Sequence, residues 1–512
     1  MKTVAPRLTA LAIAMACSHS AVAGTDIFFN PLTQSAAVAS PNHINELNSP
    51  WQTPAGLSQE NLTSMSEIEA DVNQSVVRWD GSKGAAMFDM MTYDPSGQYL
   101  FIPHETFSGA GVSRYDIKND FNEVLFSGDL NGPNGDWSND FGAFDPARFT
   151  ANGTVLLGEE WSGEGRVIEV LNPFAAPADI EYRELHSIAN VSHEGIDFSK
   201  QDDRVMYYVD ENRSGSIYKF VMDEAGDFTK GQTFVLSVND FDGDPTLNYN
   251  QNDNTTVRTG MATWVPLTDE EGTPLTATNP FAAGQSNGRA AADEVNGTPY
   301  GRPEDTEVST LANGNEVLYV AVTSETAVLA IEMTDEDTAN VQYLVTADTM
   351  KNKGFPSTTG VLNSPDNLAQ DALGNIYIIE DAPNSSDVGG DIWFVRDTNT
   401  DGVAESIDHF MSIQVNGSEA TGMIFNPANP TEFVVAVQHP SSTNLSEVPD
   451  GFGDSVWRFD LTDIVAPVCE KKAQGWAHHW KQRGVRTCSH DADANFIKKL
   501  KRADRRDHRH DH

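Results

Sequence analysis

Short apolar segments alternate along the chain with turns rich in Asp, Asn, Gly and Pro. Segments such as Arg204-Val-Met-Tyr-Tyr-Val are short and β-branched or aromatic, so they predict strands. A unit recurs: a turn such as Asp94-Pro-Ser-Gly, a strand, a polar loop, and a second strand that ends in an aromatic and a charged residue. Its copies are Tyr99–Ile117, Thr154–Leu171, Val205–Met222, Glu316–Met333, Asn375–Arg396 and Glu432–Leu461.

The spacing of these copies predicts an all-β protein, a β-propeller with about six blades. Copies follow one another at intervals of about 50 to 60 residues, the length of a four-stranded blade. The gap across residues 222–313 is twice as long. It holds either another blade around Met261–Pro266 or a long insertion. We expect the propeller to occupy residues 77–465.

The N-terminal end has the layout of a signal peptide. Lys2 and Arg7 precede an apolar run from Leu8 to Ala16, and Ala21-Val22-Ala23 follows. We therefore expect residues 1–23 to be removed and the protein to be exported, to the periplasm or outside the cell. Residues 24–76 lack periodicity and predict an extended segment.

The C-terminal end, residues 466–512, predicts a separate basic, His-rich tail. Residues 471–512 hold twelve Lys or Arg, five Asp and six His. This tail could contact the acidic core or the cell surface. Cys469 and Cys488 are the only cysteines after the leader, and an oxidising compartment would permit a disulfide between them.

The overall charge limits the partners. Seventy-five acidic and 33 basic residues give a net charge of −42, which repels nucleic acid and anionic membranes. After the leader no apolar run approaches the ~20 residues that span a bilayer, so we expect a soluble monomer without a transmembrane anchor. The surplus of carboxylates suits divalent cations.

One local pattern matches a calcium-binding loop. Oxygen-bearing side chains stand at positions 1, 3, 5, 9 and 12 of a twelve-residue stretch, with Gly402 at position 6 for the sharp turn. The alternative is an Asx-rich turn after the preceding strand. The proposed ligands are Asp397, Asn399, Asp401, Glu405 and Asp408.

A second group of acids stands at predicted strand ends, where a propeller brings its loops together around the axis. Carboxylates from several blades would repel one another unless cations lie between them. Arg302 adds a planar fork of donors that suits a phosphate. The group comprises His104-Glu105, Glu159-Glu160, His193-Glu194, Asp210-Glu211, Arg302-Pro-Glu304, Asp366-Asn367, Glu380-Asp381, Glu419 and Gln438-His439.

These stretches resemble those of the PhoX-type alkaline phosphatases, exported bacterial propeller enzymes with calcium and iron at the axis. Eight short matches occur in the same order over about 340 residues. They are Pro103-His-Glu105, Gly158-Glu-Glu160, Val191-Ser-His-Glu194-Gly, Ile217-Tyr-Lys-Phe-Val221, Arg302-Pro-Glu304, Ser364-Pro-Asp366-Asn367-Leu with Gly374-Asn-Ile, Glu419-Ala-Thr-Gly422 and Gln438-His-Pro440.

The resemblance implies a phosphatase that uses a metal-bound hydroxide or oxide to release phosphate from small phosphate monoesters. Arg302, Glu304 and Asn367 would be catalytic. Its metal ligands would be Glu105, Glu159, Glu194, Glu304, Asp366, Asn367, Glu419 and Gln438.

Two positions depart from the family pattern. Gly158 stands where the family has a cysteine that binds iron, and Pro103 replaces a common asparagine. Oxygen ligands alone favour Ca²⁺ and hold Fe³⁺ less distinctively. Two alternatives therefore stay open: a calcium-dependent propeller hydrolase of lactones or phosphodiesters, and a non-catalytic calcium-binding propeller that binds a surface partner.

Overall fold

The computed structural model describes residues 27–38, 45–76, 85–252, 255–440, 451–462 and 464. The expected signal peptide, the basic tail and both of its cysteines lie outside these residues. The three α-helices of the described part are short, and none of them is long and apolar enough to cross a membrane. They are α1 (Asn45–Asn48), α2 (Met65–Val72) and α3 (Ser286–Glu294).

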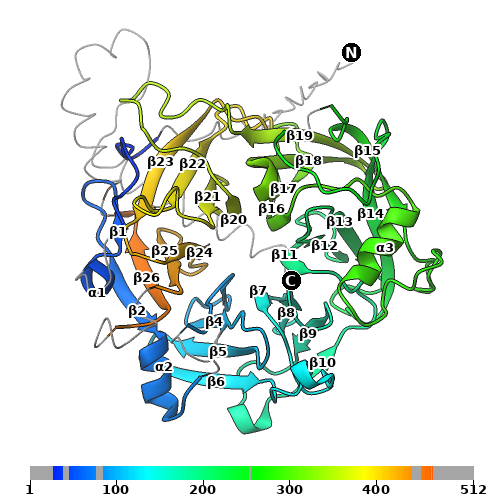
Figure 1. Cartoon of the computed structure of the whole chain (residues 1–512), viewed down its shortest axis with the longest axis horizontal. Coiled ribbons are helices and arrows are strands. Elements are labelled where there is room, and N and C mark those ends of the chain that lie inside the picture. The colour runs from blue at the N-terminus through cyan, green and yellow to red at the C-terminus, as the bar shows by residue number, and fades with distance from the viewer. Residues whose placement is uncertain are drawn as a thin grey trace, which may run out of the picture.

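Antiparallel sheets surround a single axis (Figure 1). Two of them have four strands that follow one another in the chain. The first contains β3 (Thr92–Tyr93), β4 (Tyr99–Pro103), β5 (Gly111–Asp116) and β6 (Phe121–Ser127). The second contains β7 (Phe144–Phe149), β8 (Val155–Glu159), β9 (Val167–Val170) and β10 (Tyr182–Glu184).

The next sheet has nine strands and explains the doubled gap. The strand β15 (Gly260–Pro266) pairs with β14 on one side and β19 on the other, so it joins two four-stranded units and is not a sheet of its own. One unit contains β11 (His193–Phe198), β12 (Val205–Asp210), β13 (Ile217–Met222) and β14 (Gly231–Val238). The other contains β16 (Pro303–Thr310), β17 (Glu316–Val322), β18 (Ala327–Asp335) and β19 (Thr338–Thr346).

The last two sheets each take an outer strand from the N-terminal segment. One sheet contains β20 (Pro365–Gln370), β21 (Ile376–Glu380), β22 (Asp391–Arg396) and β23 (Ser406–Ile413). The short strand β1 (Trp51–Gln52) pairs with β23 and forms its outer edge. In the other, β2 (Glu60–Ser64) pairs with β26 beside β24 (Glu419–Phe425), β25 (Glu432–Gln438) and β26 (Ser455–Asp460). The beginning and end of the ring thus share one sheet, which protects its outer edge.

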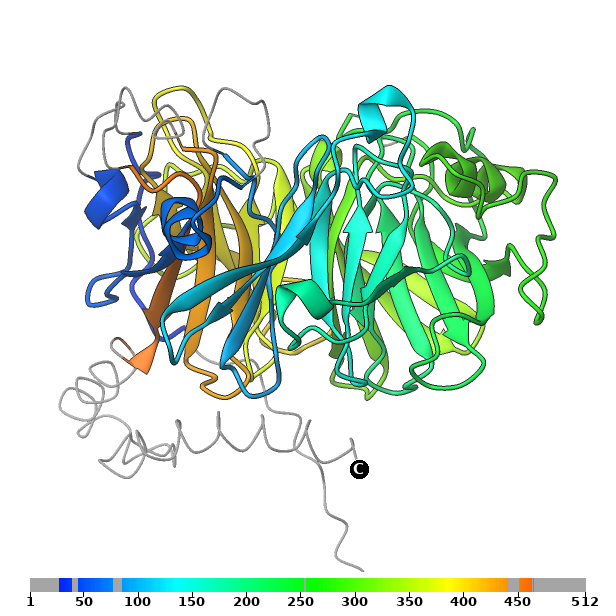
Figure 2. The same ribbon diagram turned by 90° about the horizontal axis from the view of Figure 1, so that it is seen from below.

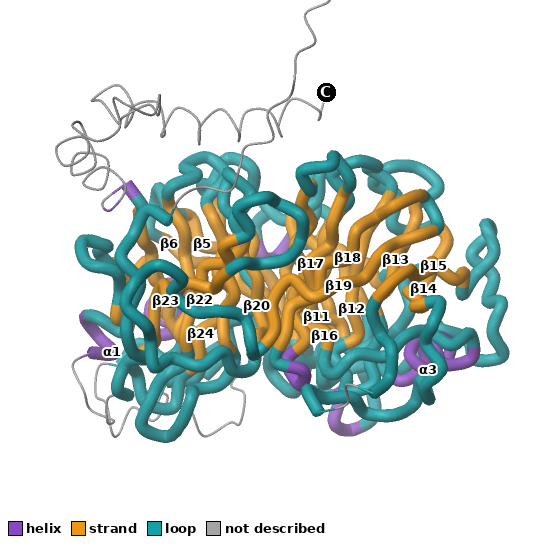
Figure 3. The backbone as a smooth tube through the Cα atoms, turned by 90° about the horizontal axis from the view of Figure 1, so that it is seen from above, coloured by secondary structure: helices purple, strands orange, loops and turns teal. Residues whose placement is uncertain are grey.

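Both faces of a typical strand are buried, because each sheet packs between two neighbours. In β22, Ile392 and Phe394 join one apolar cluster while Trp393 and Val395 join another. Such strands are apolar at successive positions, as in other sheets that are covered on both sides. The sheets stand side by side in the edge-on view (Figure 2), and α1 and α3 lie toward the same face of the ring (Figure 3).

Candidate metal centre

Four of the strands nearest the axis begin with the same irregularity. In β7, β11, β16 and β20 the pairing with the next strand skips the second and third residues. Such bulges redirect side chains and are common beside active sites. The second residue of each strand is an acid: Asp145, Glu194, Glu304 and Asp366.

Asp89 holds the corresponding position in the first sheet. Phe88 pairs with His104, and regular pairing resumes only at Thr92. The residue two positions before the acid has a positive φ in four of these five places: Met87 (55°), Ala143 (45°), Arg302 (58°) and Ser364 (43°). This conformation costs a non-glycine residue about 1–2 kcal/mol, and such strain clusters at functional sites.

A second set of acids follows the second strand of four of the units, while Thr323 holds this place after β17. The backbone N–H of these acids donates to the carbonyl oxygen of the residue two positions before the first acid. The donor–acceptor distances are 2.9 Å from Glu105 to Met87, 2.9 Å from Glu160 to Ala143, 2.8 Å from Glu211 to Ser192 and 3.1 Å from Asp381 to Ser364. One repeated backbone contact therefore places an acid from the second strand beside an acid from the first.

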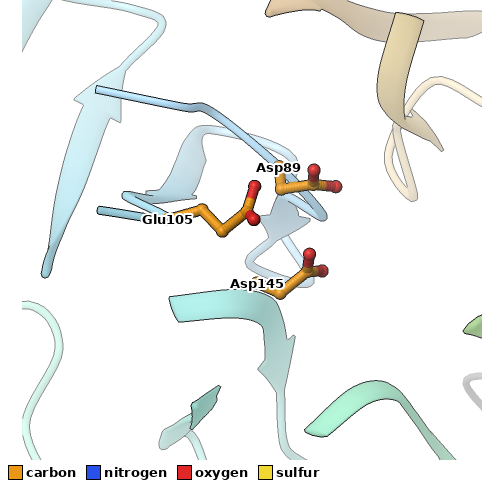
Figure 4. Close-up of side chains that lie close together, drawn as sticks. All are labelled: Asp89, Glu105 and Asp145. Carbon is orange, nitrogen blue, oxygen red and sulfur yellow. The ribbon is translucent and has the colours of Figure 1, made fainter. Parts of the chain in front are cut away.

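The acids converge in two groups that could hold metal ions. Asp89, Glu105 and Asp145 form one, and Glu194, Glu304 and Asp366 the other, with carboxylate oxygens within 4.8 Å of one another. Figure 4 shows the side chains of the first group gathered from three separate segments. All but Asp366 are buried. Among the described residues no hydrogen bond reaches Asp145 Oδ1 or Glu194 Oε2.

Burial and mutual repulsion raise the pKa of these carboxyl groups. Burial is the larger cause for Asp145, followed by the charges of Asp89 and Glu105. Burial again comes first for Glu194, followed by Glu304 and Asp366. Cations between the oxygens would reverse this effect, because they favour the charged form.

Arg302 is the guanidinium within this centre. Its Nε donates to Glu211, its Nη2 lies 3.2 Å from Glu304 Oε1, and its Nη1 lies 3.8 Å from Asp381 Oδ2. Burial opposes the charge, but Glu304 and Glu211 outweigh burial and raise the pKa of Arg302. The side chain is 28% exposed, so a ligand can reach its donors.

Gln438 and Asn367 border the first group. Gln438 Nε2 donates to Asp89 Oδ2 at 2.9 Å and to Glu105 Oε2 at 3.0 Å. Asn367 Oδ1 lies 2.6 Å from the Thr421 hydroxyl, whose single proton it shares with Asp89. Gln438 therefore contacts two acids of the group directly, whereas Asn367 reaches Asp89 only through Thr421.

Glu419 and Glu159 have other partners. Glu419 Oε1 lies 2.5 Å from His439 Nε2 at the edge of the centre. Glu159 accepts from Arg166 Nε at 2.8 Å and Nη2 at 2.6 Å, and from the backbone N–H of Gly142 at 3.1 Å. The structure thus ties Glu159 to the second sheet, while Glu160 faces the axial acids: after burial, Glu105 and Asp145 are the main causes of its raised pKa.

His104 and His193, which precede Glu105 and Glu194 in the sequence, are both buried. His104 Nε2 lies 2.9 Å from Ser113 Oγ, and its ring stacks on Phe88. Burial lowers the pKa of His104 and of His193 to about 3, so both rings are neutral. His193 also fills the space beside Gly158: a Cβ on Gly158 would lie 2.7 Å from His193 Cβ and 2.9 Å from Pro146 Cγ. A cysteine at 158 would require His193 or Pro146 to move.

The predicted calcium loop has its own internal partners. Asp397 accepts from the backbone N–H groups of Asp401 (3.2 Å) and Gly402 (2.8 Å). Glu405 accepts from Thr398, through the backbone N–H at 2.8 Å and the hydroxyl. Asp408 lies in β23 and takes two hydrogen bonds from Arg396, at 2.8 and 2.7 Å. Among the described residues, three acids with oxygens this close to one another are found at the axis and not in this loop.

Asp89 and Asp145 are the acids that sequence reasoning missed. Both follow an aromatic residue, Phe88 or Phe144, and neither belongs to a conspicuous acidic pair. Asp145 is the second residue of an innermost strand, as Glu194, Glu304 and Asp366 are, and Asp89 follows the bridge residue Phe88 in the same way. An alignment of the repeat units on their inner strands is the signal that would have found them.

The fold and the centre define the class: an all-β, propeller-like protein with clustered axial carboxylates that suit hard cations. The model of the family "Alkaline phosphatase PhoX" matches residues 121–441, more than half of the chain. The chain belongs to this family, and it is a phosphatase-type hydrolase. Asp89 and Glu105 precede the matched residues.

One solved structure supports the fold. PhoX of Pseudomonas fluorescens, in complex with the transition-state analogue vanadate, has a TM-score of 0.55 and 15% identity, over 85% of this chain and 98% of that chain. A gluconolactonase from Xanthomonas campestris has a TM-score of 0.40 and 10% identity, over 86% and 97%. The second score is too low to support a functional comparison. None of the curated proteins matches the chain in sequence.

Proposed function

We propose that this protein is an exported, metal-dependent phosphatase that releases phosphate from phosphate monoesters. The observation that carries the proposal is the pair of acid groups around the axis, in a chain of the PhoX family. So many carboxylates at short range favour bound cations. The likeness to the PhoX of Pseudomonas fluorescens, which binds vanadate, supports a phosphoryl site.

The ligand set that we propose combines the sequence and the structure. Glu105, Glu194, Glu304 and Asp366 are retained, and Asp89 and Asp145 are added. Glu160 replaces Glu159, because Glu159 is paired with Arg166. Asn367, Gln438 and Glu419 border the set and would complete the coordination or orient the acids.

Each part of the site has a role in this reaction. Bound cations supply positive charge for the phosphoryl oxygens and lower the pKa of water. Arg302 would donate to the phosphate with its exposed Nη groups, while Glu211 fixes the guanidinium through Nε. Glu304 would both bind metal and hold Arg302 in place.

Calcium is the cation that we propose for the centre. The donors are carboxylate and amide oxygens, which Ca²⁺ prefers. Iron would have to be held by oxygen alone, since Gly158 has no room for a thiolate without movement of its neighbours. The loop at Asp397–Asp408 stays a second, weaker candidate for calcium.

The remaining features of the proposal concern the whole chain. We propose six blades, with the nine-stranded sheet counted as two, and a propeller built from residues 77–465 to which the segment 24–76 adds the outer strands β1 and β2. Residues 1–23 would be removed on export, and the tail 466–512, with its Cys469–Cys488 pair, would contact the acidic core or the cell surface. We expect a monomer.

The test is a phosphatase assay with metal analysis. Purified protein, loaded with Ca²⁺, should hydrolyse a chromogenic phosphate monoester at alkaline pH and contain more than one metal ion per chain. Phosphodiesters and lactones, tested in the same assay, should be hydrolysed with lower kcat/KM than the phosphate monoester. Absence of turnover with Ca²⁺, Fe³⁺, Mg²⁺ and Mn²⁺ would rule the proposal out.

A further inference from the structure

Two exposed aromatic rings stand beside the first acid group. Trp161 is 37% exposed and Phe107 is 49% exposed, and their rings stack with centroids 6.1 Å apart and an interplanar angle of 24°. Trp161 follows Glu160, and Phe107 lies two residues after Glu105, so both rings extend from acids of the axial centre. Large exposed aromatic surfaces often mark a binding site.

The position of these rings is fixed by hydrogen bonds. The indole Nε1 of Trp161 donates to Glu105 Oε1, and the Ser162 hydroxyl donates to the carbonyl oxygen of Phe107 at 2.5 Å. The N–H of Ala143 donates to the carbonyl oxygen of Thr106 at 2.7 Å. The two loops are therefore cross-linked, and the aromatic surface exists before any ligand binds.

The chemistry of the rings points to the leaving group, not the phosphate. An aromatic face is electron-rich and gives no attraction to a phosphate anion, which the cations and Arg302 would bind instead. An aromatic side chain does attract a flat ring, because every nucleobase has a π-face that can stack on it. Because Trp161 donates to Glu105, the aromatic surface borders the acid group at which we propose that phosphate binds, and it offers the ester group a ring on which to stack.

We propose that Phe107 and Trp161 form a stacking surface for the leaving group, so that the preferred substrates are phosphate monoesters of planar aromatic groups such as nucleosides. This inference rests on the proposed phosphatase function and deepens it. The Phe107 side chain supplies stacking area and has no hydrogen-bonding group, while Trp161 combines stacking with the hydrogen bond to Glu105. The two residues are therefore separable by mutation.

The experiment compares kcat/KM for adenosine 5′-monophosphate and for glycerol 2-phosphate. Phe107→Ala should lower the value for the nucleotide roughly tenfold and leave that for glycerol 2-phosphate within about twofold. Trp161→Phe should lower both values together, because it keeps a ring but removes the hydrogen bond to Glu105. The matched control is Phe121→Ala, at an exposed Phe of the outer strand β6, which should change neither.

Equal losses on both substrates with Phe107→Ala, or no loss, would overturn the stacking surface while leaving the phosphatase intact. A protein without phosphatase activity would overturn the proposed function, and adenosine binding would then decide the inference. Calorimetry with adenosine alone should show binding to the unmodified protein that weakens with Phe107→Ala. Absence of binding, or equal binding to both, would refute the surface.

Discussion

The axial acids and the acids of the loop at residues 397–408 have the same chemistry but opposite surroundings. In the loop, Asp397 and Glu405 accept hydrogen bonds from their own turn, and Asp408 is paired with Arg396. At the axis, Asp145 and Glu194 each have an oxygen that no described group reaches, and their neighbours are other acids. A dense acidic pattern in sequence is therefore weaker support for a cation site than unsatisfied, buried convergence in space.

The sharpest contrast comes from removing one charge in each region. Glu304→Gln keeps the size of the side chain but weakens both metal binding and the hold on Arg302, so kcat/KM for a phosphate monoester should fall on the order of 10³-fold. The kcat/KM of the loop variant Asp401→Asn should stay within about twofold of that of the unmodified protein. A Glu304→Gln variant of normal activity would remove Glu304 from the centre.

The two arginines give a second matched pair. Arg302→Ala removes donors of the centre and should lower kcat/KM about 10²-fold. In the Ca²⁺-loaded protein the bound cations still compensate Glu304 and Glu211, so the free energy of unfolding should change little. Arg396→Ala leaves the buried carboxylate of Asp408 unpaired, so the free energy of unfolding should fall by about 3 kcal/mol without loss of activity per folded molecule. Urea unfolding and steady-state kinetics on both variants check the pair; an exchange of the two effects would contradict it.

Metal removal separates the regions by stability. A chelator should destabilise the protein, because cations no longer offset the repulsion at the axis; ligand at 100 times its Kd contributes about 2.7 kcal/mol. Added Ca²⁺ should restore the melting temperature. Asp401→Asn should show the same calcium-dependent shift, whereas Asp145→Asn should show a smaller one. If the loop variant alone loses the shift, the calcium site lies in the loop.

The pH dependence of the chelated protein is the smallest effect. Burial, followed by the charge of Glu304, raises the pKa of Glu211 from 4.5 to about 8. Because the folded pKa lies above the unfolded one, the protonated form favours folding, and stability should decline as pH rises from about 4.5 to 8. Urea midpoints between pH 5 and 9 should show the decline without metal and a flatter profile with Ca²⁺. If the urea midpoint of the metal-free protein rose with pH, this electrostatic explanation would be wrong.

The sequence by itself determined the strands, the repeat and the family, because these depend on local patterns: β-branched runs, turn residues and short motifs. It also predicted that Glu105, Glu194, Glu304 and Asp366 belong near one axis, since blade ends converge. The ring of blades could be predicted from the repeat alone, without any contact between distant residues.

Tertiary structure decided the rest, because it depends on which face a side chain takes and on distant partners. Only the structure shows that Glu159 is paired with Arg166, whereas its neighbour Glu160 is close to the axial acids. In the pairing of β2 with β26, the Asn61 side chain donates to the carbonyl oxygen of Val456 across 395 residues, beyond the reach of any local pattern. The bulge at Asp145 and the isolated bridge beside Asp89 arise from strand pairing, and it is this pairing that turns scattered acids into a site.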